Sequence, residues 1–321
     1  FKLLIKKSLF ILKPNLSSFP MQLIIKKLSI ILIFIITFGF NHSKLLAQNE
    51  NNFEDYGLIS IMYHRFDEQK YPSTNIQLKV FKEQLEIIEK EGIKFIHPNN
   101  IDKVLSENKN ERKILLTVDD GLSSFYKNAW PILKEKKIPL LLFVNTREVG
   151  SFNYMNWEQI IELYNEDNVV IGNHSHSHEY LVDENSDVIK NDIVKSMKIF
   201  KDKIGKNSDF FSYPFGEYSL EFKKIIKDLG FKYAFGQHSG VIDDSKDRWE
   251  LPRFPINEKY GEIKRFKTLM KTLPFKYENI FPKERYLLQS NNRISFYIPL
   301  FAQAKNKAWI SKTWVHGSFI L

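Results

Sequence analysis

Residues 113–121 read Lys-Ile-Leu-Leu-Thr-Val-Asp-Asp-Gly, an apolar run that ends in two adjacent carboxylates and a glycine. The run predicts a buried strand over residues 113–118. Two carboxylates at a strand end repel each other, so such a pair usually has a counter-charge, either a metal ion or an arginine. Asp-Asp-Gly is also a common turn sequence, so Asp119 and Asp120 alone leave both interpretations open.

Around this stretch, short apolar runs alternate with helix-like segments, which is the pattern of a βαβ chain with a largely parallel sheet. Helices are expected at 81–90 and at 220–229, where Gly230 ends the second. The number of strands predicts an α/β fold of the distorted (β/α)7-type, a closed or nearly closed barrel with its catalytic groups at the C-terminal strand ends. The expected strands are residues 58–62, 94–96, 113–118, 140–144, 169–171, 210–213 and 232–235.

A second polar cluster, Asn-His-Ser-His-Ser-His at 173–178, also follows an apolar run. His174 and His178 are four residues apart, so one helical turn would place both imidazoles on the same face, as metal pairs require. An exposed loop with three histidines fits the same sequence. Together with Asp120, the two histidines would supply three protein ligands and leave a position for water, as in a catalytic zinc site.

Composition limits the classes of function. The chain has no cysteine, which excludes disulfides, thiolate ligands and a cysteine nucleophile, so histidines and carboxylates must hold any metal. Residues 1–50 hold seven of the 47 basic residues and one of the 38 acidic ones, which leaves 40 against 37 for the rest. The net charge of +9 therefore belongs mostly to the N-terminal segment, and no basic stripe indicates a nucleic-acid partner.

The N-terminal segment has the order of a secretory signal. Two lysines at 26–27 precede an apolar run at 30–36, and small or polar residues follow near Ala47. Residues 1–47 are therefore interpreted as a leader, either cleaved or retained as a membrane anchor, and both alternatives export the rest of the chain. The sequence begins with phenylalanine, so we hypothesise that translation starts at Met21.

The motifs Thr-Val-Asp-Asp-Gly at 117–121 and His-Ser-His-Ser-His at 174–178 resemble the first two motifs of the NodB-homology polysaccharide deacetylases, carbohydrate esterase family 4. A third segment, Phe-Ser-Tyr-Pro-Phe-Gly-Glu-Tyr at 211–218, is similar to that family's aromatic-Pro-aromatic-Gly motif. The resemblance covers about residues 56–260 and implies a NodB-type domain there. Residues 261–321 would form a C-terminal extension, to which the sequence assigns neither a fold nor a function.

The resemblance implies a role for each matching residue. Asp119 would be the general base, and Asp120, His174 and His178 would be the metal ligands, with His176 as a neighbour. The substrate-binding positions would be Tyr213, Pro214, Phe215 and Gly216, with the two aromatic rings walling a sugar groove and a backbone N–H near Phe215 holding the oxyanion.

Two positions depart from the family pattern. The third motif often begins with an arginine that orients the base, but Ser212 stands there, and Arg253 in Leu-Pro-Arg-Phe-Pro at 251–255 is the expected substitute. A C-terminal Leu-x-x-His that would supply the general acid is not evident, and His316 in the tail is not assigned that role. His64, at the end of the first strand, is expected to be the acid, as in the similar subgroup that deacetylates bacterial poly-N-acetylglucosamine.

The resemblance implies a metal-dependent hydrolase that removes N-acetyl groups from a polymer containing N-acetylglucosamine. The expected cofactor is a divalent ion, zinc or alternatively Co, Ni, Mn or Fe. Two alternatives remain open at this point: a carbohydrate-binding homologue without activity, and an amidohydrolase for small N-acyl compounds. The expected location is exported, whether periplasmic, extracellular or membrane-anchored.

Overall fold

A curled sheet forms the centre of the protein. The computed structural model describes residues 55–107, 110–284, 286 and 295–297. The sheet order is β10-β1-β5-β6-β7-β8-β9, with β11 paired to β1 and β4 to β5, and every pair is parallel except β1 with β10. Its strands are β1 (Leu58–Tyr63), β4 (Lys94–Phe95), β5 (Lys113–Val118), β6 (Leu140–Val144), β7 (Val169–Asn173), β8 (Phe210–Ser212), β9 (Tyr233–Phe235), β10 (Val241–Ile242) and β11 (Phe254–Pro255).

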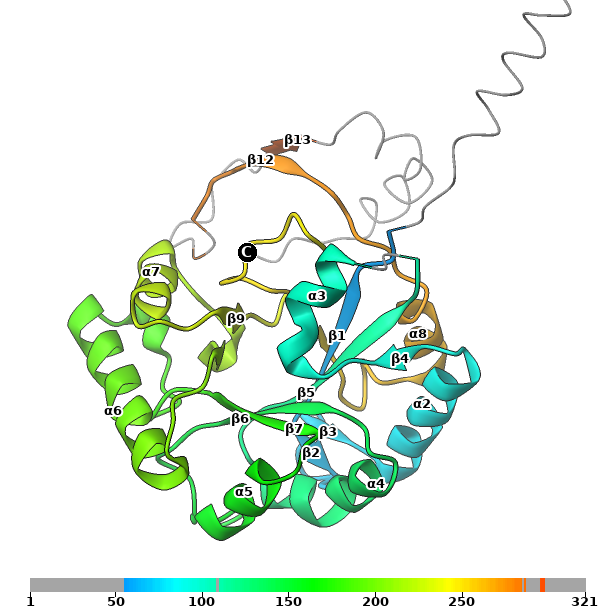
Figure 1. Ribbon diagram of the computed structural model, residues 1–321, viewed down its shortest axis with the longest axis horizontal. Coiled ribbons are helices and arrows are strands. Elements are labelled where there is room, and N and C mark those ends of the chain that lie inside the picture. The colour runs from blue at the N-terminus through cyan, green and yellow to red at the C-terminus, as the bar shows by residue number, and fades with distance from the viewer. Residues whose placement is uncertain (1–54, 108–109, 285, 287–294, 298–321) are drawn as a thin grey trace, which may run out of the picture. The chain divides into compact units, whose positions relative to one another are not determined.

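Helices surround the strands, as the ring of coiled ribbons in Figure 1 shows. The longest, α6, begins where the Asn185 side chain accepts hydrogen bonds from two backbone N–H groups and ends at Gly205, whose φ is 80°. The helices are α2 (Leu78–Lys90), α3 (Ile101–Ser106), α4 (Trp130–Glu135), α5 (Trp157–Tyr164), α6 (Ser186–Ile204), α7 (Leu220–Asp228) and α8 (Ile263–Leu269).

Shorter elements complete the described chain. Two small sheets pair β2 (Arg65–Phe66) with β3 (Asn75–Ile76) and β12 (Glu278–Phe281) with β13 (Ser295–Tyr297). A π-helical turn, η2 (Phe125–Ala129), precedes α4. Single 3-10 turns are η1 (Pro98–Asn100), η3 (Leu181–Asp183) and η4 (Pro214–Gly216).

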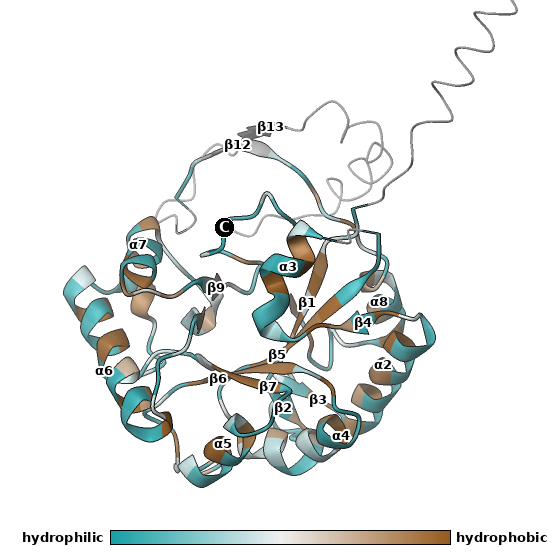
Figure 2. Cartoon of the chain, in the orientation of Figure 1, coloured by the Kyte–Doolittle hydropathy of each residue, from teal (hydrophilic) through white to brown (hydrophobic). Residues whose placement is uncertain are grey.

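The sheet is buried on both faces. Ile114, Leu116 and Val118 of β5 pack in a cluster with residues of the outer helices, whereas Leu115 packs in a second cluster with Leu141 and other inward-facing residues. The apolar colour of the strands and of the inner helix faces in Figure 2 follows this arrangement. Because side chains alternate along a strand, Leu115, Thr117 and the following Asp119 point inward. The alternation of side chains along β5 therefore places the Asp119 carboxylate in the interior.

The two ends of the curled sheet are joined by residues 251–256. Leu251 donates its backbone N–H to the carbonyl of Ala234 in β9, and Ile256 donates to that of Met62 in β1. The expected barrel is thus a half-barrel of mixed strand direction, completed by this crossing segment instead of by an uninterrupted ladder. Arg253 lies on the crossing segment and enters the interior.

All seven predicted strands are present, with ends shifted by at most two residues. β8 stops at Ser212 because Pro214 has no N–H to continue the ladder. Within the described ranges no helix is both long and apolar enough to cross a bilayer. The leader at 1–47 and His316 lie outside the residues that the structure describes.

Candidate active site

Three side chains that follow the ends of β5 and β7 converge on one point. Nε2 of His174 and Nε2 of His178 each lie 3.5 Å from Oδ1 of Asp120. These atoms lie within 4.8 Å of one another, and this is the group of potential metal ligands found among the described residues. A tetrahedral ion with ligand bonds of about 2.0–2.2 Å holds its ligand atoms roughly 3.3–3.6 Å apart, so the spacing fits a metal.

Two of these atoms are buried without a hydrogen-bond partner, namely Oδ1 of Asp120 and Nε2 of His174. Buried polar atoms are nearly always paired, so an unpaired acceptor beside an unpaired ring nitrogen needs a further group. On the other side of its ring, Nδ1 of His174 lies 2.7 Å from the backbone carbonyl oxygen of Ser212. A carbonyl oxygen can only accept, so Nδ1 donates this hydrogen bond, and Nε2, which faces Asp120, is the ring nitrogen left for a metal, as in metal-binding histidines.

The loop that carries the two histidines is not helical. Ser175 and His178 have positive φ of 68° and 53°, so the expected helical turn is wrong. The loop is shaped by side-chain acceptors: Oδ1 of Asn173 accepts from the backbone N–H of Ser175, and Oγ of Ser175 accepts from that of His178. Both imidazoles still reach the same point, because the backbone reverses its direction within the loop.

The electrostatics of the ligand group suit a cation. Burial, and next the nearby His174, lower the pKa of His178 to about 4, so its imidazole is neutral at pH 7. Burial alone would raise the pKa of the Asp120 carboxyl, but the adjacent His174 and the other surrounding histidines hold that pKa well below its ordinary value. A neutral imidazole and an ionised carboxylate are the protonation states that bind metals.

His176 does not belong to this group. Its Nδ1 lies 2.9 Å from Oγ1 of Thr146, and its backbone N–H donates to Oδ1 of Asp192. Asp192 also accepts from the backbone N–H of Ser177, so this carboxylate on α6 fixes the middle of the loop. The sequence analysis missed Asp192, because nothing in the helix pattern of residues 186–204 marks one acid among several as the loop anchor.

Asp119 forms a second, separate centre with Arg253. The guanidinium donates from Nη1 to Oδ1 at 2.7 Å and from Nη2 to Oδ2 at 2.8 Å, and neither side chain is exposed. Arg253 also donates to Thr117, to Ser212 and to the carbonyl of Gly236, so all of its nitrogens are used. This bidentate geometry makes a strong arginine–carboxylate ion pair.

Asp119 is held as a carboxylate close to the ligand group. Burial would raise its pKa, but the Arg253 guanidinium and then His174 outweigh burial and lower the pKa below its ordinary value. Oδ2 of Asp119 lies 3.9 Å from Nε2 of His174 and accepts from Oγ of Ser212 at 3.2 Å. Ser212, which the sequence marked only as a departure, thus contacts Asp119, Arg253 and His174.

His64 lies at the same edge of the sheet. It follows β1, whose Tyr63 is in register with Val118 and accepts a hydrogen bond from the backbone N–H of Asp119. The charge of His64 acts on Asp119 and Asp120, so the structure brings this histidine to both aspartates. The side chain is half-buried.

The four positions of the third motif differ in placement. Tyr213 is fully buried, stacks on Tyr218 at 4.8 Å and donates its hydroxyl to the carbonyl of Trp249, so its assignment to the groove wall is wrong. Pro214 is buried as well. Phe215 is 48% exposed, and its ring lies 4.9 Å from that of His178. Gly216 packs against Gln237 so closely that a Cβ would clash.

The backbone is strained at this site. Asp120, His178 and Phe215 all have positive φ, of 75°, 53° and 57°. For an aromatic residue such as Phe215 this conformation is uncommon and costs about 1–3 kcal/mol. Strain of this kind clusters at functional sites, and here it coincides with the residues that surround the potential metal position.

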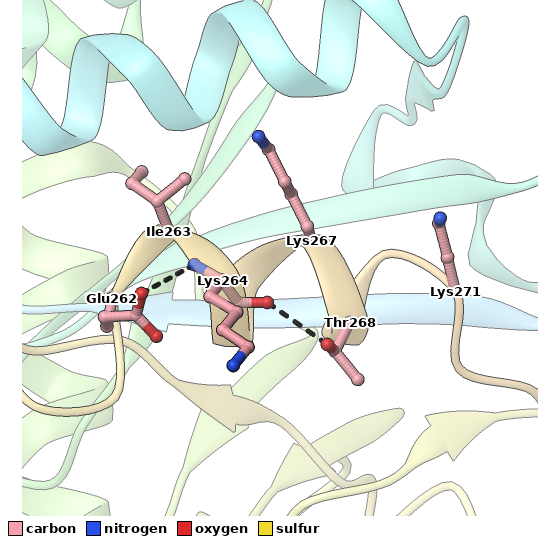
Figure 3. A pocket seen from close by; sticks show the side chains of 6 residues that line it. All are labelled: Glu262, Ile263, Lys264, Lys267, Thr268 and Lys271. Atoms are coloured by element: carbon pink, nitrogen blue, oxygen red, sulfur yellow. Dashed lines mark hydrogen bonds between the residues drawn. The ribbon is translucent and has the colours of Figure 1, made fainter.

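A separate surface hollow lies on α8, and Figure 3 shows its lining side chains. The Glu262 carboxylate accepts from the backbone N–H of Lys264, and Thr268 donates to the carbonyl of Lys264. These bonds belong to the helix itself, and three lysines with one acid offer no metal site. The hollow is therefore not part of the candidate active site.

The half-barrel and its convergent ligands define the class of protein. Residues 106–234 match the sequence profile of the family described as polysaccharide deacetylase. This match agrees with the resemblance found in the motifs of the chain.

The relatives are more particular. A poly-beta-1,6-N-acetyl-D-glucosamine N-deacetylase of Staphylococcus epidermidis is 24% identical over 269 residues, which cover 74% of this chain and 93% of that protein. Among solved structures, IcaB from Ammonifex degensii has a TM-score of 0.62 at 24% identity and covers 68% of this chain and 99% of that one. The Streptococcus pyogenes deacetylase PplD in complex with acetate has a TM-score of 0.61 at 22% identity, with 67% and 99% covered. These two structures share the fold of this protein.

Proposed function

We propose that the protein is a metal-dependent N-deacetylase of a polysaccharide that contains N-acetylglucosamine. The observation that carries the proposal is the pairing of two centres. One is a group of three potential ligands, Asp120, His174 and His178, of which the first two have a buried atom without a hydrogen-bond partner. The other is a buried carboxylate, Asp119, ionised by Arg253 and 3.9 Å from a ligand nitrogen. The relatives' names and the family supply the reaction and the polymer.

The ligand group would hold a divalent ion, with zinc the first candidate because two imidazoles and one carboxylate form a set that zinc accepts. Such an ion, when bound, makes water more acidic and polarises a carbonyl oxygen.

Asp119 takes a proton from the attacking water. A protonated Asp119 could not accept this proton. The ion pair with Arg253 prevents protonation by stabilising the charged carboxylate. The water oxygen bonds to the acetamide carbonyl carbon, and the C–N bond then breaks. The hydrogen-bond donors of Arg253 are all taken up by Asp119, Ser212, Thr117 and Gly236. We therefore assign Arg253 a positioning role.

His64 gives a proton to the departing amine. It follows β1 as Asp119 follows β5, so the base and the acid come from the ends of adjacent strands. Protonation of the nitrogen is needed because an amine anion is a very poor leaving group. The products are acetate and a free glucosamine unit.

The alternatives fit the described residues less well. A homologue that only binds carbohydrate would not need a buried, arginine-paired carboxylate beside the ligand group, since such a pair is costly to bury. An amidohydrolase for small N-acyl compounds would favour an enclosed site, whereas Phe215 and Tyr180 are 48% and 40% exposed. We further propose that residues 1–47 export the domain, as a cleaved signal or as a membrane anchor.

Acetate release from a panel of acetylated glycans tests the proposal. The purified chain, measured with and without added zinc, should release acetate from poly-β-1,6-N-acetylglucosamine, and a chelator should stop the release. Absence of release from every glycan, with one equivalent of zinc bound, would favour the binding-only homologue. Release from small N-acyl compounds alone would favour the amidohydrolase.

A further inference from the structure

Three aromatic rings continue outward from the ligand group. The Phe215 ring lies 4.9 Å from His178, the Tyr180 ring 5.5 Å from Phe215, and the Tyr286 ring 6.3 Å from Tyr180. Each ring meets the next at a tilted or edge-on angle. We call Phe215, Tyr180 and Tyr286 the aromatic ledge.

The rings of the aromatic ledge are partly exposed, although large aromatic side chains usually pack inside a protein. Phe215 and Tyr180 are 48% and 40% exposed, and Tyr286 is half-buried. Each ring buries one edge against its neighbour and leaves area for another molecule. Large rings grouped on a surface in this way mark binding sites, whereas single exposed apolar residues do not.

The outer end of the ledge is fixed by contacts with two elements, η3 and α7. The Tyr286 hydroxyl donates to Oδ1 of Asp183 in η3. Its backbone N–H donates to Oε1 of Glu284 at 3.0 Å. Glu284 in turn accepts from the backbone N–H of Leu220 at the start of α7. The segment after β12 is therefore anchored to α7 and η3, which holds Tyr286 beside Tyr180.

The chemistry of the ledge fits a sugar chain. Aromatic faces carry partial negative charge, so they attract the C–H faces of pyranose rings, while the tyrosine hydroxyls keep polar partners within reach. A single ring at Phe215 could hold only the sugar that is being deacetylated. A row of three rings that leads away from His178 can hold that sugar and the units next to it.

We propose that Tyr180 and Tyr286 extend the site beyond Phe215 and bind the neighbouring units of an acetylated glycan chain, so that the enzyme acts on chains of several units. This inference rests on the proposed deacetylase function. It also gives the C-terminal extension a role, since Tyr286 belongs to the residues after 260.

Oligosaccharide length is the measurement that tests the ledge. Binding of β-1,6-linked N-acetylglucosamine disaccharide and pentasaccharide is measured by calorimetry on the zinc-loaded full chain, together with kcat/KM for acetate release from each. Wild type should prefer the pentasaccharide. Tyr180→Ala and Tyr286→Ala should each weaken pentasaccharide binding by about 2- to 10-fold and leave disaccharide binding unchanged.

Two controls separate the ledge from general stability. Tyr164→Ala removes a partly buried tyrosine at the end of α5, which lies five residues before β7 and so at the opposite edge of the sheet from His174. It should leave the pentasaccharide-to-disaccharide ratio as in wild type. Tyr286→Phe keeps the ring and removes the bond to Asp183, so the ratio should fall less than in Tyr286→Ala.

The length ratio does not depend on how much of a variant is folded, so partial unfolding cannot imitate the effect. An unchanged ratio in both alanine variants, with wild type active on both oligomers, would overturn the ledge and leave the deacetylase proposal standing. Failure of wild type to bind or deacetylate either oligomer would instead contradict the proposed function on which the ledge rests.

Discussion

Arg253 and Asp119, 134 positions apart in the sequence, form a two-pronged ion pair from which solvent is fully excluded. A buried ion pair adds little net stability, but removing one partner leaves an uncompensated charge. Arg253→Met should therefore lower the free energy of unfolding by about 3–5 kcal/mol, measured by urea denaturation. Arg253→Met combined with Asp119→Asn should recover much of that loss. A double variant no more stable than Arg253→Met would contradict this account of the pair.

The same pair predicts how stability responds to acid. The folded pKa of Asp119 is below its ordinary value of 3.8, so its stabilising contribution is fully present above about pH 3.8 and is lost as pH falls below that value. Unfolding free energies measured between about pH 2 and 5 should thus fall more steeply with acid in wild type than in Asp119→Asn. Both proteins are kept in chelator so that metal release does not enter. Equal slopes would mean that Asp119 is not held ionised by Arg253.

The base and the acid should respond differently to the leaving group. Asp119→Asn and His64→Ala should each reduce deacetylation of an N-acetylated glycan by about 10²- to 10⁴-fold, with metal content unchanged. An aryl acetate ester needs no proton on its leaving group, so His64→Ala should retain far more activity on the ester than Asp119→Asn. If the two variants lost the same share of their activity on the ester, His64 would not be the general acid.

The two histidines of one loop provide a matched comparison for the metal. His174→Ala removes a ligand and should abolish zinc binding and activity together, as measured by elemental analysis and acetate release. His176→Ala, two residues along, removes only a contact with Thr146 and should keep the zinc. Zinc retained in His174→Ala, or lost from His176→Ala alone, would contradict the ligand assignment.

The positive φ of Phe215 predicts opposite effects on stability and activity. Phe215→Gly relieves the strained backbone, whereas Phe215→Ala keeps the strain and removes the same ring contacts. The glycine variant should be more stable than the alanine variant by about 1 kcal/mol in urea denaturation. Both should lose activity on glycans because the ring beside His178 is gone. A glycine variant no more stable than alanine would show that the conformation is not strained.

Much of this arrangement could be predicted from the sequence, because parallel strands bring their C-terminal ends to one edge. The apolar runs before Asp119 and before His174 were enough to place both clusters at that edge. The position of His64 followed from the first strand in the same way.

What could not be predicted depends on backbone and on distant residues. The carbonyl of Ser212 that orients His174 carries no sequence signal, since any residue supplies a carbonyl. The expected groove role of Tyr213 was wrong because its ring lies on the same face of the chain as Phe211, two residues earlier, and packs with it in the core. Tyr286 was missed because the residues after 260 showed no recognisable pattern.

The crossing segment at 251–256 bears on where this enzyme can be cut. The stretch that matches the family profile, residues 106–234, contains Asp119 and the three proposed metal ligands, but it excludes both Arg253 and the first strand. A fragment trimmed to that stretch would leave the buried Asp119 carboxylate without its Arg253 partner. Its sheet would lack β1. We therefore expect the smallest piece that folds on its own to run from β1 to beyond Ile256, so that expression boundaries, deletions and chimaeric joins belong outside those limits.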